Sequence, residues 1–140
     1  MHQAKIKDKI REIEKYLDEF GSIVPSHFEE YQHSFEKKAA CERYFEKIVE
    51  AVVDLAFMVI KEKGLKIPEE EKETFDRLAE EEVISKGLAT RLKDAKGMRN
   101  LLSHQYGNVD DEIVFKSITE ELDKDVRHFI WKIINFPNRK

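Results

Sequence analysis

The fold is decided by residues 26–64, SHFEEYQHSFEKKAACERYFEKIVEAVVDLAFMVIKEKG, which contain no glycine or proline before Gly64. Apolar side chains recur in this stretch at the three- and four-residue spacings of a helix that is buried along one face. Pro25 and the capping-box pattern of residues 26–29 predict where the helix begins. We expect one long helix, whose inner side is formed by Phe28, Tyr31, Phe35, Phe45, Ile48, Val52, Leu55 and Val59.

Further amphipathic segments precede and follow this stretch. A first helix is expected over residues 3–20, ending at Gly21, with Ile6, Ile10, Ile13, Leu17 and Phe20 at alternating spacings of four and three. A short helix is expected near 70–82, with Phe75, Leu78 and Ala79 inward. Ser85 is a cap for a helix over 86–106, and Asp110 or Asp111 for the last helix. The inward side chains of the last helix are Ile118, Leu122, Val126, Phe129, Ile133 and Ile134.

No segment has the pattern of a β-strand, and the 140 residues suffice for one domain with a hydrophobic core. The predicted fold class is all-α, an up-and-down helical bundle of four main helices plus one short helix, in a single domain of residues 1–140. The polar N-terminus and the lack of a long apolar run predict a cytoplasmic protein without a membrane span.

Metal and disulfide chemistry find little support in the sequence. The one cysteine, Cys41, lies among apolar neighbours and excludes an intramolecular disulfide or a four-cysteine zinc site. The pairs Glu30-x-x-His33 and Asp125-x-x-His128 have the ligand spacing of carboxylate-bridged metal sites. Helical periodicity places both pairs away from the apolar faces of their helices. We therefore expect them to face water and predict no metal site and no cofactor.

Charge is unevenly distributed along a chain whose net charge is −4. Residues 86–99 carry five cations against Asp94, and residues 69–82 carry eight acidic side chains. This basic segment is either a solvated helix face or a surface that attracts a phosphate-bearing ligand. On the second interpretation, Arg91, Lys93 and Lys96 are the candidate residues for binding the phosphates of that ligand.

Arg99 occupies a position at which helical periodicity calls for an apolar residue. It falls within a stripe formed by Leu88, Leu92, Ala95, Leu102 and Tyr106. A charge in such a position is costly unless it is paired or faces a polar site. Its position is therefore the first indication that this helix has a chemical role.

The residues that follow supply compatible chemistry. His104, near the negative end of the helix dipole, is suited to general-acid catalysis, and Arg99 is suited to holding a phosphodiester. Asn100 can bind a phosphate or position its neighbours. Five residues on one helix separate Arg99 from His104 by roughly 140°, so the two side chains converge only if the helix loosens or two subunits contribute. A capping histidine beside an arginine that pairs with an acid on another helix is the structural alternative.

Arg99, Asn100, His104 and Tyr106 together resemble the R-x4-H-x-Y signature of HEPN-domain toxins of the HepT type. The resemblance implies a HEPN-like helical bundle that dimerises and acts as a metal-independent endoribonuclease toxin in a type VII-like toxin–antitoxin pair. It implies that Arg99 holds the scissile phosphate, that His104 is the acid or base, and that Asn100 supports them. The implied partners are RNA, a second copy of the chain, and a minimal nucleotidyltransferase antitoxin of the MntA type, which adds AMP to Tyr106.

Two other functions are compatible with the same sequence. Related helical proteins have been viewed as non-catalytic substrate-binding subunits of two-chain nucleotidyltransferases, and such a subunit would also need a basic groove. A purely structural dimerisation bundle is a further interpretation. It gives no reason for an arginine within the apolar stripe.

Overall fold

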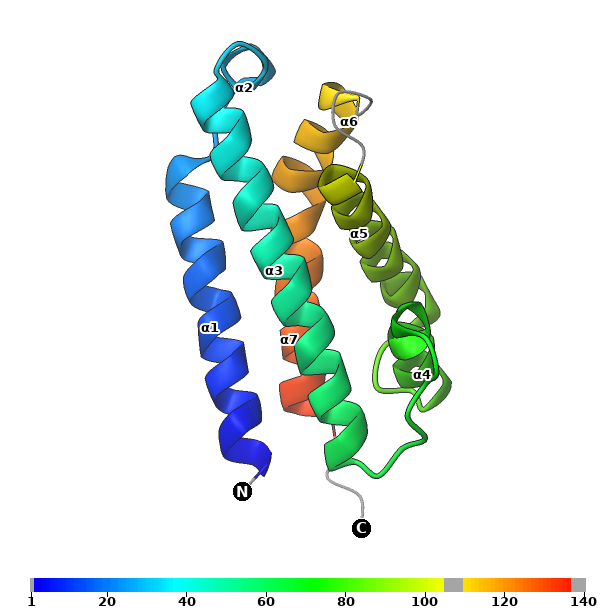
Figure 1. The fold of residues 1–140 in the computed structure, drawn as a ribbon. Helices are drawn as coiled ribbons and strands as arrows, with labels where there is room; N and C mark the ends of the chain where they lie inside the picture. The colour runs from blue at the N-terminus through cyan, green and yellow to red at the C-terminus, as the bar shows by residue number, and fades with distance from the viewer. Residues whose placement is uncertain (1, 105–109, 137–140) are drawn as a thin grey trace.

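The structure, a computed structural model, describes residues 2–104 and 110–136. Its four long helices run side by side (Figure 1): α1 (His2–Ile23), α3 (Phe35–Glu62), α5 (Lys86–His104) and α7 (Leu122–Asn135). Between them lie α2 (Phe28–Gln32), the 3-10 turn η1 (Glu71–Glu73), α4 (Thr74–Glu80), α6 (Asp111–Lys116) and the π-helical turn η2 (Ser117–Glu121). These two ranges contain no β-strand. The predicted all-α bundle of four main helices is confirmed.

The core forms where α3 packs against α1, α4 and α5, and where α7 closes the bundle from behind (Figure 1). Phe75 of α4 meets Phe129 of α7 edge to face, with ring centroids 5.9 Å apart. Each fully buried side chain of this kind contributes about 1.5–3 kcal/mol relative to its exposure. The largest fully buried side chains are Tyr31, Phe45, Phe75, Phe129, Ile13, Leu17, Ile48, Leu55, Ile60, Leu78, Leu88 and Val52.

The long helix expected over residues 26–64 is divided in two. The chain leaves the helix after Gln32, and Ser34 caps a new helix by accepting a hydrogen bond from the backbone N–H of Lys37. Because the break resets the helical phase, Phe35 is 91% exposed, and its predicted inward position was wrong. The capping box predicted at Ser26 was also wrong, since α2 has no side-chain cap.

The two ends of the bundle depart from the predicted pattern in smaller ways. α1 continues through Gly21 to Ile23 and ends two residues before Pro25, since the residue before a proline disfavours helical geometry. Ile134, predicted to face inward, is 63% exposed. It lines a surface hollow of about 470 Å³ beside Ile6 and Val59, near the end of α7.

The expected caps of the later helices are confirmed. Ser85 Oγ accepts from the backbone N–H of Leu88 at 3.0 Å, which fixes the start of α5. Asp110 accepts from the backbone N–H groups of Glu112 and Ile113, which fixes the start of α6. The starts of α5 and α6 are therefore each fixed by a side chain that lies next to them in the sequence.

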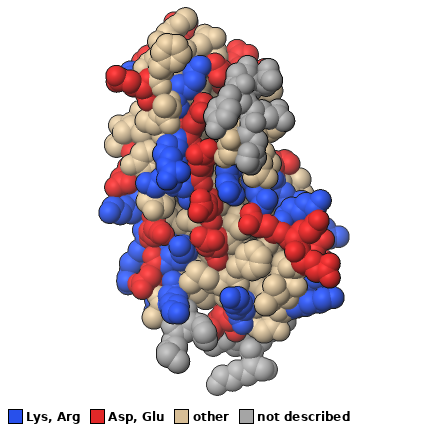
Figure 2. All heavy atoms as spheres, in the orientation of Figure 1, with Lys and Arg blue, Asp and Glu red and all other residues tan. Residues whose placement is uncertain are grey.

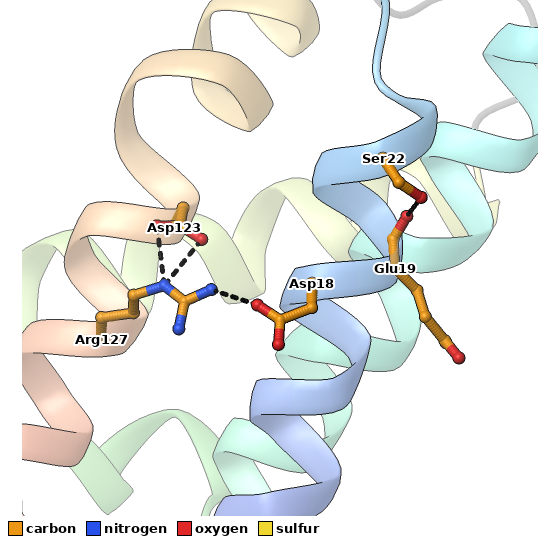
Figure 3. A network of polar contacts seen from close by, with 5 residues as sticks. All are labelled: Asp18, Glu19, Ser22, Asp123 and Arg127. Atoms are coloured by element: carbon orange, nitrogen blue, oxygen red, sulfur yellow. Dashed lines mark hydrogen bonds and ion pairs between the residues drawn. The ribbon is translucent and has the colours of Figure 1, made fainter.

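Polar side chains also join the outer faces of the helices. Arg127 of α7 donates to Asp123 on its own helix and to Asp18 of α1, both at about 3 Å (Figure 3). These hydrogen bonds raise the pKa of Arg127 above its ordinary value. Exposed pairs of this kind contribute little stability, so the packed apolar faces hold α1 and α7 together. None of the described helices is long and apolar enough to cross a membrane.

Candidate functional site

The inner face of α5 is apolar up to its final turns. Leu88 and Leu92 are buried, and Leu102 is 7% exposed, as the predicted stripe requires. Arg99 lies between them, and its side chain is 25% exposed, so the guanidinium lies at the edge of the buried face. The partly buried position of Arg99 is therefore the one that helical periodicity predicted.

Arg99 and Lys96 share one carboxylate from the acidic segment. Arg99 Nη1 lies 3.8 Å from Glu71 Oε1, and Lys96 Nζ lies 3.4 Å from the same oxygen. Neither distance is that of a close charge-assisted hydrogen bond, which is about 2.7–2.9 Å. The structural alternative was an arginine that pairs with an acid on another helix. Arg99 does contact an acid on another element, Glu71, but the contact is long.

The cations nearer the start of α5 are bound more closely. Arg91 Nε donates to Asp125 Oδ1 of α7 at 3.0 Å, and Lys93 Nζ donates to both oxygens of Asp76 of α4, at 3.0 and 3.1 Å. These ion pairs join α5 to its neighbours. Arg91 and Lys93 therefore already have a structural role, and a contact with RNA stays a prediction for them and for Lys96.

The remainder of the motif lies within residues 100–106. Asn100 is exposed, and Ser103 Oγ donates to Glu46 Oε1 of α3 at 3.0 Å. His104 is the last residue of α5, and its side chain is not among those described. Tyr106 lies outside the described residues. The roles of His104, Asn100 and Tyr106 therefore stay predictions.

The two carboxylate–histidine pairs are not brought together. His33, Glu30 and His128 are exposed, as expected. The expectation that Asp125 faces water was wrong. It lies three residues after Leu122 and four before Phe129, on the inner face of α7, and is 6% exposed. No group of three or more potential metal ligands occurs within residues 2–104 and 110–136.

A line of acidic side chains, here called the acidic row, runs along α3 between cations on either side (Figure 2). It consists of Glu42, Glu46, Glu50 and Asp54, one per helical turn. Burial raises the pKa of Glu42 and that of Asp54, and nearby carboxylates raise both further. The regular four-residue spacing was visible in the sequence, but the contact of Glu46 with α5 required the fold.

The fold and the motif together define a class: all-α bundles with an arginine and a histidine near the end of the third main helix. The chain belongs to the Ribonuclease HepT-like family, whose model matches residues 6–133. The resemblance inferred from residues 99–106 is thereby confirmed at the level of the family.

Named relatives agree with this assignment. The chain is 25% identical over 119 residues to the tRNA nuclease HepT of Aphanizomenon flos-aquae, covering 85% of this chain and 81% of the relative. It is 29% identical over 85 residues to the mRNA nuclease HepT of Shewanella oneidensis, covering 61% and 63%. The predicted class of enzyme, a ribonuclease, is confirmed by the family and these relatives.

A solved structure shares the fold. The tri-AMPylated HEPN toxin of Shewanella oneidensis, in complex with MNT antitoxin, superposes with a TM-score of 0.85 at 24% identity. The superposition covers 92% of this chain and 96% of that one. At this identity the likeness establishes the HEPN fold of the bundle.

Proposed function

We propose that this chain is a metal-independent endoribonuclease and the toxin of a type VII-like toxin–antitoxin pair. Membership of the Ribonuclease HepT-like family supports RNA cleavage, as do relatives named as tRNA and mRNA nucleases. The structural neighbour in complex with an MNT antitoxin supports a nucleotidyltransferase partner. We place the reaction in the cytoplasm, where RNA is the available substrate.

The observation that carries the proposal is the state of Arg99. Its guanidinium is partly buried beside the apolar face of α5 and is held only loosely, at 3.8 Å from Glu71. A phosphodiester offers the same guanidinium two oxygens in the planar arrangement that suits bidentate hydrogen bonds. Replacing a loose carboxylate contact by such a pair provides binding energy for RNA at this position.

In the proposed reaction, Arg99 binds the scissile phosphate and stabilises the negative charge that develops on it. The 2′-hydroxyl of the RNA loses its proton to water and attacks the phosphorus, and the bond to the 5′-oxygen of the next nucleotide breaks, which leaves a 2′,3′-cyclic phosphate. His104, at the carbonyl end of α5, protonates that leaving oxygen, while Asn100 supports the phosphate. The reaction needs no metal, because the substrate supplies its own nucleophile.

We propose a homodimer as the active form. Arg99 and His104 diverge by roughly 140° on a regular helix, so a cleft between two copies can combine the arginine of one with the histidine of the other. Sedimentation of the active protein at micromolar concentration should give the mass of a dimer. An active monomer would contradict the composite site.

Silencing is proposed to occur by AMP addition to Tyr106. The attached phosphodiester would pair with Arg99 and occupy the place of the RNA phosphate. With its cognate nucleotidyltransferase and ATP, the wild-type chain should gain whole AMP units by intact-mass spectrometry and lose activity, and the Tyr106→Phe variant should not. Inhibition that persists in that variant would indicate silencing by simple binding.

The decisive experiment is cleavage of total RNA in EDTA by wild type and by His104→Ala. His128→Ala is the matched control, because His128 is an exposed histidine on α7. Wild type and the control should cleave, and His104→Ala should not. Absence of cleavage by the wild type, with retained nucleotide or RNA binding, would favour the non-catalytic binding subunit of a two-chain nucleotidyltransferase.

A further inference from the structure

We propose that Glu46 of α3 is a positioning residue for the Arg–His motif and that it acts through Ser103. The inference rests on the proposed function, because it assigns a supporting residue to that same site. Ser103 Oγ donates to Glu46 Oε1 at 3.0 Å across two helices that are far apart in sequence. Ser103 is half-buried, and the Glu46 side chain is 24% exposed, so water competes only partly for this hydrogen bond.

This hydrogen bond lies where α5 is otherwise weakly held. The close ion pairs of α5, made by Arg91 and Lys93, lie at least eight residues before its final turn. Among residues 97–103, the bond from Ser103 is the single side-chain hydrogen bond that the structure contains. The last carbonyl groups of a helix have no partner within it, so a final turn opens easily unless a tertiary contact holds it.

Two contacts together fix the orientation of this turn. Leu102 packs into the core and sets the depth of α5 against its neighbours. The hydrogen bond at the next residue, Ser103, restrains rotation about the helix axis. Arg99 lies one turn earlier on nearly the same face as Ser103, and His104 follows Ser103 directly. The bond therefore constrains both residues to which the motif assigns chemistry.

Glu46 is distinguished from the other members of the acidic row. It is the only one of the four that forms a hydrogen bond with α5 in the described part of the chain. Its second oxygen, Oε2, lies 3.8 Å from Arg43 Nη1 on the same helix. Glu50, one turn along, is exposed and provides a matched control of equal charge.

The test compares steady-state RNA cleavage by Glu46→Ala, Glu46→Gln, Ser103→Ala and Glu50→Ala, well below their melting temperatures. A loss of positioning lowers kcat and leaves substrate binding nearly unchanged, so we expect kcat to fall about tenfold in Glu46→Ala and Ser103→Ala, with KM within about twofold. Glu46→Gln keeps an acceptor oxygen and should retain most of kcat, and Glu50→Ala should match wild type. The double variant Glu46→Ala/Ser103→Ala should be no worse than either single variant.

Amide hydrogen exchange at residues 100–104 shows whether the hydrogen bond from Ser103 anchors the final turn of α5, separately from its effect on catalysis. Exchange should be about tenfold faster in Glu46→Ala and Ser103→Ala than in Glu50→Ala. Faster exchange with unchanged kcat would show a structural anchor only and would overturn the positioning role. Unchanged exchange together with unchanged kcat would remove the anchor as well. A wild type that cleaves no RNA would refute the proposed function and with it the positioning role, whatever the exchange rates show.

Discussion

The two halves of α5 hold their cations in different ways. In the first half, Arg91 and Lys93 form ion pairs at 3.0 Å with carboxylates of α7 and α4. In the second half, Lys96 and Arg99 share one oxygen of Glu71 at 3.4 and 3.8 Å. Short, separate pairs fix a helix in place, whereas two cations that share a distant oxygen keep hydrogen-bonding capacity for another anion. We therefore expect structural charges in the first half and, at Arg99, a charge that a ligand can use. The Arg99 side chain is 25% exposed, and that of Lys96 is 12% exposed.

The largest effect is expected for Arg99→Ala. Loss of a charged donor that stabilises the developing negative charge should lower kcat/KM by at least about hundredfold. The free energy of unfolding should change by less than about 0.5 kcal/mol, because the contact with Glu71 is long and partly exposed. Cleavage assays and urea unfolding measure the two quantities. Arg11→Ala, which removes an exposed arginine from α1, is the control. A large loss of stability in Arg99→Ala would assign Arg99 to the structural class.

Arg91→Ala should show the opposite behaviour. It leaves Asp125, which is 6% exposed, without its guanidinium partner. Since Arg91 is itself 45% exposed, water partly compensates, and we expect a loss of about 2 kcal/mol in the free energy of unfolding. At saturating RNA, the rate of cleavage per folded molecule should stay within about twofold of wild type.

Asp125→Asn removes the charge from the other side of the same ion pair. Asparagine retains an acceptor oxygen, and Arg91 can turn toward solvent, so the loss should be smaller than in Arg91→Ala. Urea unfolding at neutral pH measures both variants. Equal stability of Arg91→Ala and wild type would remove the distinction between the two halves of α5.

Much of this comparison could be anticipated from the sequence. The apolar spacing gave the four main helices, and the caps at Ser85 and Asp110 were found because a side-chain acceptor next to a helix start acts locally. The position of Arg99 followed from its place within the stripe. These features depend on near neighbours along the chain.

The remainder depends on contacts between distant segments. The break at Ser34 replaces one long helix by two, and no glycine or proline marks it. Glu71 and Glu46 are each one of several acidic residues in their segments, and only the packing of η1 and α3 against α5 selects them. Asp125 was misplaced because the exposed position of His128 was extended to its partner three residues earlier.

Glu71→Gln tests the loosely held pair directly, with a smaller expected effect. Removing the shared carboxylate leaves Lys96 and Arg99 available to RNA, so the KM for RNA should fall about threefold at moderate salt. Glu69→Gln is the matched control, because it removes the same charge from the same acidic segment and is exposed. An equal fall in KM in both variants would mean that net charge alone, and not the shared contact, governs RNA binding.

The smallest effect concerns Glu42 of the acidic row. Burial raises the pKa of its carboxyl group in the folded protein, nearby Asp111 and Glu46 raise it further, and Lys38 lowers it. A group with a raised pKa favours the folded state below its ordinary pKa, and this contribution is lost as pH rises through the raised value. At about pH 7, Glu42→Gln should therefore be more stable than wild type, by about 0.5 kcal/mol once screening by solvent is included. The advantage should shrink as the pH falls toward about 4.3, the ordinary value for glutamate. Urea unfolding at several pH values, with the exposed Glu50→Gln as control, measures this trend. An advantage that grows on acidification would show that Glu42 stabilises the bundle as a charged partner of Lys38.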